Sequence, residues 1–495
     1  MSNRHAVKTN LATVDTRRSS NLYTKTQKGG VETATKRASL QPSKLPRDSH
    51  SIKKLSDSFE THYQRSRETI AKTTACQVYL AEYVPTGQKC LVKQLNKKGT
   101  VKDMHESRTC AVEAGAWMDI SHPSLARVLE VVQDEHCFYV VSEACSGSLI
   151  AERRKAAAED WAACVLFQVL SMLRTVHSVG RLHLAIAPDT IWLVERQGKP
   201  EIKVRSPLGT PGLVHAKDKE FAQTEAPERE KSEVSDVWSC GVVLYFLLSC
   251  ELPYTSDTYH QLLNSKHKPE IAFSYFWQHI NPKAKSLVSH MLSARPDSRP
   301  SVQDCLSDPW LASHHLSIPS KVLDHSVKQL LTAHKITPVR SAVLNFLIAR
   351  VMKDSELAAY AEVFQALDTD GSGTLTPEEL RTGLERLMSP ASAAARVIHI
   401  TAVVQPGAND AISYHQYLLS AIDQHALFSH ENLRLAFAHF DSDHSGTISA
   451  SELKVSLFGN SPQSESLWKE LSRSAALRDG VVTFREFVDM IKSIC

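Results

Sequence analysis

The sequence predicts a multidomain chain in which an α+β bilobal domain is followed by an all-α domain of repeated helix–loop–helix units. Paired strand patterns come first and long helical patterns second, an order typical of α+β domains. These patterns lie at 78–82, 88–95, 106–120, 127–132, 137–141, 156–176 and 236–248. Further downstream, acidic loops recur between amphipathic helical patterns, which indicates helix–loop–helix repeats.

Composition and periodicity divide the chain into four segments. With 495 residues, it has room for about three folded units. We expect a basic, disordered tail at 1–58, the bilobal domain at 59–312, a helical junction at 313–357 and the helix–loop–helix domain at 358–495.

The tail carries most of the positive charge. Residues 1–54 contain 12 Lys/Arg against 3 Asp/Glu, a balance of +9, whereas the whole chain is +3. Low hydrophobicity combined with net charge favours disorder. Two interpretations remain open: a tether to an acidic membrane surface or to the cytoskeleton, or a solvated tail with no dedicated partner. We expect no nucleic-acid partner.

The chain has no segment typical of membrane insertion or export. No apolar run reaches the roughly 18 residues of a spanning helix, and the N-terminus has no apolar signal segment. Ten cysteines occur without C-x-x-C pairs, which favours reduced thiols. We therefore expect a cytoplasmic protein without a transmembrane segment, at most peripheral to a membrane or the cytoskeleton.

Several short motifs follow one another in the first domain in a fixed order. They are Leu91-Val92-Lys93, Glu113 ten residues before Pro123, Ala226-Pro227-Glu228, Asp236-Val237-Trp238-Ser239-Cys240-Gly241 and Arg299-Pro300. Through these motifs, residues 59–312 resemble a protein kinase domain. The resemblance implies that Glu228 pairs with Arg299 and that Asp236 anchors the catalytic-loop backbone. It also implies that Lys93 and Glu113 form the ion pair that positions ATP phosphates, kept here as a vestigial ATP site or for packing alone.

The residues that perform phosphoryl transfer in kinases are replaced. Residues 183–190 (HLAIAPDT) stand where a kinase has H-R-D-L-K-P-E-N, so Ala185 replaces the proton acceptor and Thr190 replaces a Mg²⁺ ligand. Ser206 stands at the position of the Asp that holds the other Mg²⁺. The glycines of the phosphate-binding loop are replaced by Ala71, Thr73 and Cys76.

From these losses we expect no catalytic residues and neither ATP nor Mg²⁺ as a cofactor. The alternative is a calcium-regulated serine/threonine kinase with atypical or residual activity, or an ATP binder that uses Lys93 and Glu113.

Two segments match the twelve-residue EF-hand calcium loop throughout. Oxygen donors stand at positions 1, 3, 5 and 7, and a glutamate at position 12 closes the site. Hard oxygen ligands in this number select Ca²⁺, with a sensor-range affinity of roughly 10⁻⁷–10⁻⁵ M. The expected ligands are Asp368, Asp370, Ser372, Thr374 and Glu379 in the first loop, and Asp441, Asp443, Ser445, Thr447 and Glu452 in the second.

Each complete loop is followed by a degenerate one. Residues 405–416 keep Ile412 but have Gln at positions 1 and 12, and residues 475–486 lose the acids at positions 1 and 3. We expect them to serve for pairing, through short β contacts of Leu375 with Ile412 and of Ile448 with Val482. Two bound Ca²⁺ ions, one per pair of hands, is the simplest count.

The junction predicts two helices, at 320–334 and 339–352, separated near Pro338. The second has an apolar face beside basic residues, which a calmodulin-type lobe grips. Ordinary packing against the neighbouring domain is an equally good interpretation.

A kinase fold, a helical junction and four EF-hands in this order resemble the calcium-dependent protein kinases of plants and protists over residues 59–495. In that family, Ca²⁺ remodels the EF-hand lobes, which engage the junction and relieve inhibition of the kinase. We therefore predict a calcium-sensing pseudokinase that changes shape on binding Ca²⁺ and presents a docking surface to an unidentified protein partner.

Overall fold

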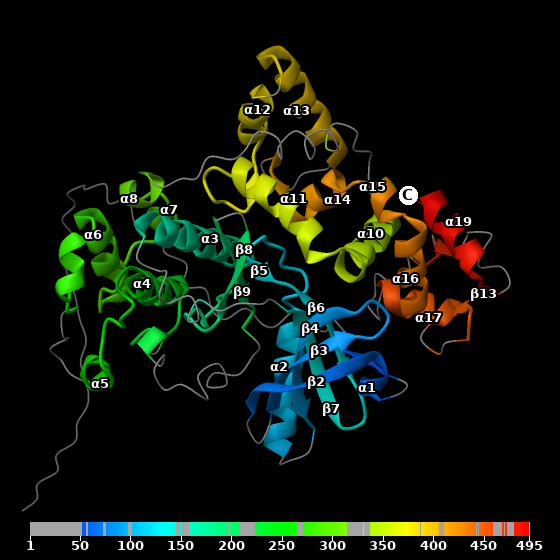
Figure 1. Ribbon diagram of the computed structural model, residues 1–495, viewed down its shortest axis with the longest axis horizontal. Helices are drawn as coiled ribbons and strands as arrows, with labels where there is room; N and C mark the ends of the chain where they lie inside the picture. The colour runs from blue at the N-terminus through cyan, green and yellow to red at the C-terminus, as the bar shows by residue number, and fades with distance from the viewer. Residues whose placement is uncertain are drawn as a thin grey trace, which may run out of the picture. The chain divides into compact units, whose positions relative to one another are not determined.

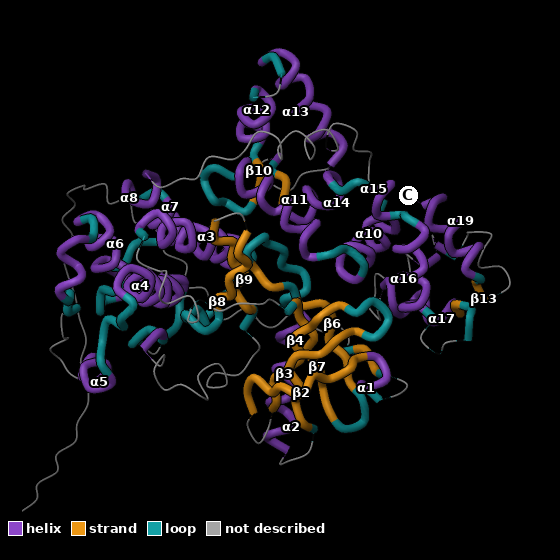
Figure 2. Tube along the Cα trace, viewed as in Figure 1, coloured by secondary structure: helices purple, strands orange, loops and turns teal. Residues whose placement is uncertain are grey.

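The computed structural model describes residues 52–494 except 56–57, 73–75, 98–100, 145–148, 150–157, 197–198, 208–222, 229, 265–270, 314–329, 331–336, 387, 405–409, 442, 444, 459–467, 470 and 473–479. The predictions for residues 1–51, for the first junction helix apart from Leu330, and for Thr73 lie outside the described residues. Strands gather mainly in one lobe, and most of the remaining elements are helices (Figure 2).

The small lobe is a six-stranded sheet in the order β1-β6-β7-β4-β3-β2, drawn in blue and cyan in Figure 1. Its neighbouring strands are antiparallel except β1 and β6. The predicted strand pairs are confirmed by β3 with β4 and by β6 with β7. The elements are β1 (Lys53–Lys54), α1 (Phe59–His62), β2 (Tyr63–Lys72), β3 (Cys76–Tyr83), β4 (Gln88–Asn96), α2 (Val101–Gly115), β6 (Val128–Gln133) and β7 (Cys137–Glu143).

Strand β1 shortens the predicted tail. Lys53 and Lys54, assigned above to the disordered segment 1–58, pair in parallel with Val132 and Gln133 at the edge of the sheet. Ile52 packs against the hydrophobic core beside them. The free edge of β6 offers backbone partners that the composition of the tail does not reveal.

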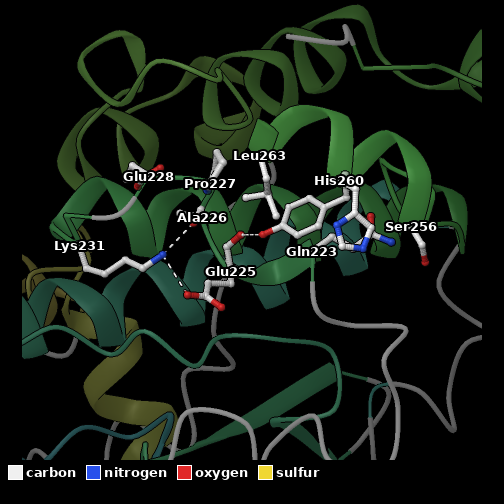
Figure 3. A pocket seen from close by; sticks show the side chains of 10 residues that line it. Gln223, Glu225, Ala226, Pro227, Glu228, Lys231, Ser256, His260 and Leu263 are labelled. Atoms are coloured by element: carbon white, nitrogen blue, oxygen red, sulfur yellow. Dashed lines mark hydrogen bonds and ion pairs between the residues drawn. The ribbon is translucent and has the colours of Figure 1, made fainter. Parts of the chain in front are cut away.

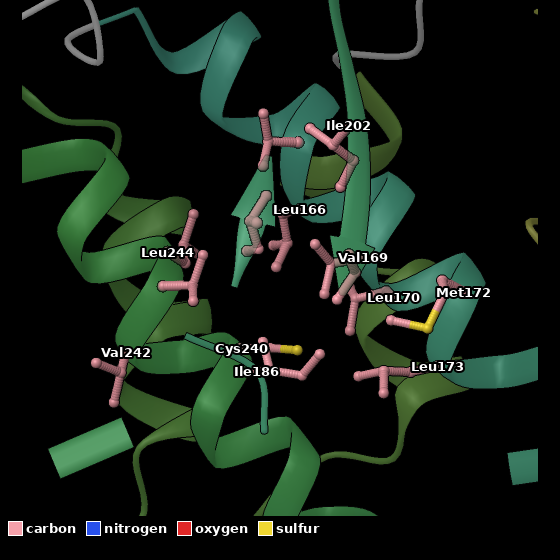
Figure 4. Close-up of a cluster of buried hydrophobic side chains, with 14 of the residues drawn as sticks. Leu166, Val169, Leu170, Met172, Leu173, Ile186, Ile202, Cys240, Val242 and Leu244 are labelled. Carbon is pink, nitrogen blue, oxygen red and sulfur yellow. The ribbon is translucent and has the colours of Figure 1, made fainter. Parts of the chain in front are cut away.

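The large lobe is helical around a three-stranded sheet in the order β5-β9-β8. Helices α3 and α4 form its centre, and their apolar side chains meet Ile186 and Ile202 in one cluster (Figure 4). The elements are β5 (Leu125–Ala126), α3 (Glu159–Ser178), β8 (Ile191–Arg196), β9 (Lys199–Arg205), α4 (Glu233–Ser249), α5 (Ser256–Asn264), η2 (Tyr275–His279), α6 (Pro282–Met291), η3 (Pro296–Ser298), α7 (Val302–Leu306) and α8 (Pro309–Ser313). Among the described residues, no helix is both long and apolar enough to span a membrane.

The C-terminal part is built from helix–loop–helix units. Its two short sheets pair Leu375 with Ile412 and Ile448 with Val482, as predicted. The elements are α10 (Pro338–Arg350), α11 (Asp354–Leu367), β10 (Thr374–Leu375), α12 (Pro377–Glu385), α13 (Pro390–Val404), β11 (Ile412–Ser413), α14 (Tyr414–Ala421), α15 (Gln424–Leu427), α16 (His430–Phe440), β12 (Ile448–Ser449), α17 (Ala450–Phe458), β13 (Val481–Val482) and α19 (Phe484–Ile494).

Helix α10 is the second predicted junction helix. Its start is fixed by Thr337, whose hydroxyl accepts a hydrogen bond from the Arg340 backbone, and by Pro338 at the first helical position. The helix contacts α14, α16, α17 and α19, and Phe346 stacks on Phe440 with 4.3 Å between ring centroids. The junction helix is therefore packed against helices of both pairs of hands.

Candidate functional site

Lys93 lies in β4, and its side chain is buried. Its ammonium donates a hydrogen bond to the Cys110 sulfur of α2 at 3.3 Å. Burial raises the pKa of the Cys76 thiol to about 11, and it also raises the pKa of Cys110. The lysine is therefore close to two protonated thiols. One of them, Cys76, is the first residue of β3.

Sequence reasoning missed Cys110. The only signal was its position three residues before Glu113 on one helix, which places both on the same side of α2. Glu113 is partly buried on that helix.

The catalytic-loop positions do not provide phosphoryl-transfer groups. Ala185 has no side-chain oxygen. The Thr190 hydroxyl is buried, accepts a hydrogen bond from the Ala187 backbone N–H at 2.9 Å and lies 2.9 Å from the carbonyls of Ala185 and Ala187, to which it donates. This hydroxyl closes the turn of its own loop. The Ser206 hydroxyl is buried and has no hydrogen-bond partner within the part of the chain that the structure describes.

The backbone of that loop is nevertheless held as in a kinase. The buried Asp236 carboxylate accepts hydrogen bonds from the backbone N–H groups of His183 at 2.9 Å and Leu184 at 2.6 Å, and from the His177 ring at 2.8 Å. Leu184 has a φ of 56°, a strained conformation for a residue with a side chain. The predicted anchoring role of Asp236 is confirmed.

The second predicted structural pair is also confirmed. Arg299 donates two hydrogen bonds to the Glu228 carboxylate, both at 2.8 Å, and its side chain is fully buried. These fork-like contacts hold the segment before α4 to the segment after α6.

In each complete EF-hand loop, three carboxylates converge. Oxygens of Asp368, Asp370 and Glu379 lie within 4.8 Å of one another, and those of Asp441, Asp443 and Glu452 form an equivalent group. Because like charges repel at this spacing, such a cluster favours a cation at its centre. No other group of this kind is found among the described residues.

The uncharged oxygen atoms expected to bind Ca²⁺ lie within the same loops. The Ser372 hydroxyl is 2.8 Å from the Thr374 carbonyl, and the Ser445 hydroxyl is 2.9 Å from the Thr447 carbonyl. Gly373 and Gly446 make the turn with φ values of 74° and 82°, which side chains rarely adopt. The donors are all oxygens, and this set fits Ca²⁺.

The carboxylates of the first loop repel one another. Burial raises the pKa of Asp368, Glu379 and Asp370 also raise it, and hydrogen bonds from Gly373 and Ser372 lower it, which leaves this pKa at about 8. A divalent cation would remove the repulsion that these carboxylates share.

The degenerate hands keep the local structure of the complete ones. Gln416 accepts a hydrogen bond from the Ser413 N–H at 2.9 Å, and Glu486 accepts one from the Thr483 N–H at 2.8 Å. Glu379 and Glu452 make the same capping contact in the complete hands. Helix capping therefore explains these two residues without a metal. Gln405, Ala475 and Leu477 lie outside the described residues.

A pocket of about 700 Å³ lies in the large lobe, between residues 223–231 and α5 (Figure 3). On one side, Lys231 pairs with Glu225 at 3.1 Å. On the other, the Tyr259 hydroxyl donates to the Glu225 carbonyl at 2.5 Å. Leu263, 40% exposed, adds an apolar contact surface.

Known protein families match both parts of this architecture. Residues 65–311 match the protein kinase domain family, and residues 361–384 and 433–457 match the EF hand. The fold and its loops therefore define a protein kinase fold joined to calcium-binding EF-hands.

Curated relatives share this arrangement along most of their length. Calcium-dependent protein kinase 9 of Arabidopsis thaliana is 31% identical over 434 residues, which cover 84% of this chain and 79% of the relative. Calcium-dependent protein kinase 33 of the same plant is 30% identical over 434 residues, with 84% and 82% covered. Calcium-dependent protein kinase 4 of Plasmodium berghei (strain Anka) is 28% identical over 457 residues, with 86% and 85% covered. The chain belongs to the calcium-dependent protein kinase family.

The Arg299–Glu228 pair allows a stability prediction. Replacing Arg299 by Ala leaves a partly buried carboxylate without its partner, and we expect the free energy of unfolding to fall by about 3–5 kcal/mol. Arg299→Lys keeps the charge but loses the paired hydrogen bonds of the guanidinium, so the free energy of unfolding should fall by less. Urea unfolding followed by tryptophan fluorescence measures both, because Trp238 and Trp277 are buried in this domain. An Arg299→Ala protein as stable as the parent would show that the pair does not hold the lobe together.

Proposed function

We propose that this member of the family is a calcium-sensing regulatory protein whose kinase-fold domain does not transfer phosphate. Ca²⁺ binding changes the shape of the molecule and controls its docking to a protein partner. The observation that carries this proposal is the contrast in the catalytic loop: Asp236 still holds the loop, while Ala185 and Thr190 supply neither proton acceptor nor metal ligand.

The loss of chemistry follows from what each position offers. A kinase needs an acceptor for the substrate hydroxyl proton and oxygen ligands for two Mg²⁺ ions. The methyl group of Ala185 accepts no proton, and the Thr190 hydroxyl is committed to its own turn. Ser206 is a neutral, buried hydroxyl. We propose that each replacement lowers the rate by orders of magnitude.

We also propose the calcium ligands by residue. Carboxylates and the carbonyls of Thr374 and Thr447 would surround one ion in each loop, and the serine hydroxyls would complete the set. The remaining ligands are Asp368, Asp370, Ser372 and Glu379 in the first loop and Asp441, Asp443, Ser445 and Glu452 in the second.

The proposed domains are the kinase fold at 59–312, to which strand β1 (Lys53–Lys54) adds an edge strand, the junction at 313–357 and the EF-hand domain at 358–495. We propose the pocket beside α5 as a docking surface for the protein partner. It combines the exposed Leu263 with the exposed carboxylate of Glu225, which suits a peptide segment with an apolar and a basic side chain.

A second candidate function is a calcium-regulated serine/threonine kinase, or an ATP binder, with atypical activity. Two observations favour it. Lys93 remains buried in the small lobe at its family position, and the relatives are named as kinases. In this case Lys93 and Glu113 would position the nucleotide phosphates.

Calcium stoichiometry tests the assigned ligands. We expect two Ca²⁺ ions per chain in a calorimetric titration, and one ion in each of the variants Glu379→Gln and Glu452→Gln, because each loses its bidentate ligand. Glu486→Gln in the degenerate fourth hand is the matched control and should still bind two. If Glu379→Gln or Glu452→Gln retained both ions at unchanged affinity, the ligand assignment would be wrong.

Thermal unfolding with ATP and Mg²⁺ separates the two candidate functions. A ligand that binds the folded state raises its melting temperature. The regulatory function predicts no shift in melting temperature at millimolar ATP in the presence of Ca²⁺. The second candidate predicts a rise that Lys93→Met abolishes, and such a rise would overturn the expectation that ATP is not a cofactor.

The basic segment 1–54 is proposed as a tether to an acidic membrane surface. Deleting residues 1–51, which leaves Ile52 and strand β1 in place, should abolish sedimentation with phosphatidylserine vesicles and leave calcium stoichiometry unchanged, because attraction to anionic lipid depends on the lysines and arginines of this segment. Phosphatidylcholine vesicles are the control. Equal sedimentation of the full and shortened chains would exclude the tether, and filament pelleting would then test the cytoskeletal alternative.

A further inference from the structure

The two complete calcium loops share a set of internal hydrogen bonds. The Ser372 N–H donates to Asp368 at 2.7 Å, and the Ser445 N–H donates to Asp441 at 2.8 Å. The same serines donate to Asp370 and Asp443, at 2.9 and 3.0 Å. The surroundings of the two loops are therefore one source of a difference in their calcium affinity.

The first loop lies against the large lobe of the kinase fold. A Cβ on Gly371 would come within 3.1 Å of the Phe167 ring in α3 and 3.2 Å of Leu306 in α7. A Cβ on Gly373 would overlap the Thr175 hydroxyl of α3. In the second loop, by contrast, a Cβ on Gly446 would meet no described atom within 4 Å.

A cation from α3 reaches one of the proposed calcium ligands of the first loop. The Arg174 guanidinium donates from Nη1 to the Asp370 carbonyl at 2.9 Å, and its Nη2 lies 3.4 Å from the Asp370 carboxylate. The side chains are 29% and 48% exposed, so both can exchange these contacts for water. Among the described residues, Asp443 of the second loop has no corresponding ion pair.

We propose that Arg174 sets the affinity of the first calcium site by competing with Ca²⁺ for the negative charge of Asp370. While the loop is docked on α3, the first site binds Ca²⁺ more weakly than it would without the guanidinium. This inference rests on the calcium ligands proposed above.

The size and sign of the effect follow from Coulomb attraction. Asp370 cannot give its full charge to Ca²⁺ while a guanidinium lies beside it, and the two cations repel one another. Partly exposed ion pairs are worth about 0.2–1 kcal/mol, which corresponds to a change in affinity of about 1.5- to 5-fold.

The coupling is reciprocal. If Arg174 weakens Ca²⁺ binding, then bound Ca²⁺ weakens the hold of Arg174 on the loop by the same factor. Ca²⁺ in the first loop thereby loosens the contact between the first EF-hand and α3. Arg174 is a positioning residue, since it acts through Asp370 and is not itself a ligand.

A calcium titration of single-site variants of the full chain tests this proposal. Glu452→Gln disables the second loop, so that calorimetry reports the first site alone. Adding Arg174→Gln should tighten the remaining site by about three-fold. In the Glu379→Gln background, which reports the second site, Arg174→Gln should leave the affinity unchanged.

Three further variants control for charge and for folding. Arg108→Gln removes an exposed charge on α2 and should leave the first site unchanged. Arg174→Lys keeps the cation and should stay close to the parent affinity. Arg174→Met keeps a long side chain on α3 without the charge; it should tighten the first site as Arg174→Gln does, and it replaces that variant if Arg174→Gln fails to fold.

Some results would overturn the proposal. An unchanged or weaker first site in Arg174→Gln, or equal tightening of both sites, would do so. A Glu452→Gln protein that binds no Ca²⁺ would instead show that the proposed ligands are wrong.

Discussion

The kinase-fold domain depends on one buried carboxylate. Asp236 accepts the backbone hydrogen bonds of Leu184 and of the buried His183, whose amide would otherwise be unsatisfied in the interior. It thereby holds Leu184 at a positive φ and fixes the loop that in a kinase carries the catalytic groups. The hydrogen bonds that shape this loop are therefore separate from the side chains that would transfer phosphate. The chain retains the hydrogen bonds of Asp236, whereas Ala185 and Thr190 replace the catalytic side chains.

The junction helix α10 and the first EF-hand each contact one lobe of the kinase fold through side chains. Arg350, at the end of α10, pairs with Glu130 of the small lobe at 2.8 Å and donates to the Tyr63 hydroxyl at 3.0 Å. On the large lobe, Gln365 near the end of α11 donates to Ser124 at 3.1 Å. Gln365 lies shortly before Asp368, so its contact with the large lobe adjoins the first calcium loop. The buried Arg350 pair is the costlier one to break.

Part of this could be predicted from the sequence. The carboxylate clusters of the calcium loops and the pairing of Leu375 with Ile412 follow from motifs of fixed spacing, whereas the Glu228–Arg299 pair, 71 positions apart, was implied only by the resemblance to protein kinases. Other features have no local signal. Strand β1 is only two residues long, and it forms because β6 has a free edge. The contact of Arg174 with Asp370 joins residues 196 positions apart, and nothing near either residue indicates it. The Thr190 hydroxyl bonds to the Ala187 carbonyl because of the shape of the turn between them. The presence of threonine at position 190 does not by itself specify that shape.

The proposed function requires that calcium control a kinase fold that transfers no phosphate. The most direct test is transfer of labelled γ-phosphate from Mg-ATP by the full chain, onto itself and onto a basic peptide mixture, with and without Ca²⁺. The account predicts no incorporation above that of an otherwise identical Lys93→Met protein in either condition. Calcium-dependent incorporation that Lys93→Met abolishes would contradict it and would establish the chain as an atypical calcium-regulated kinase.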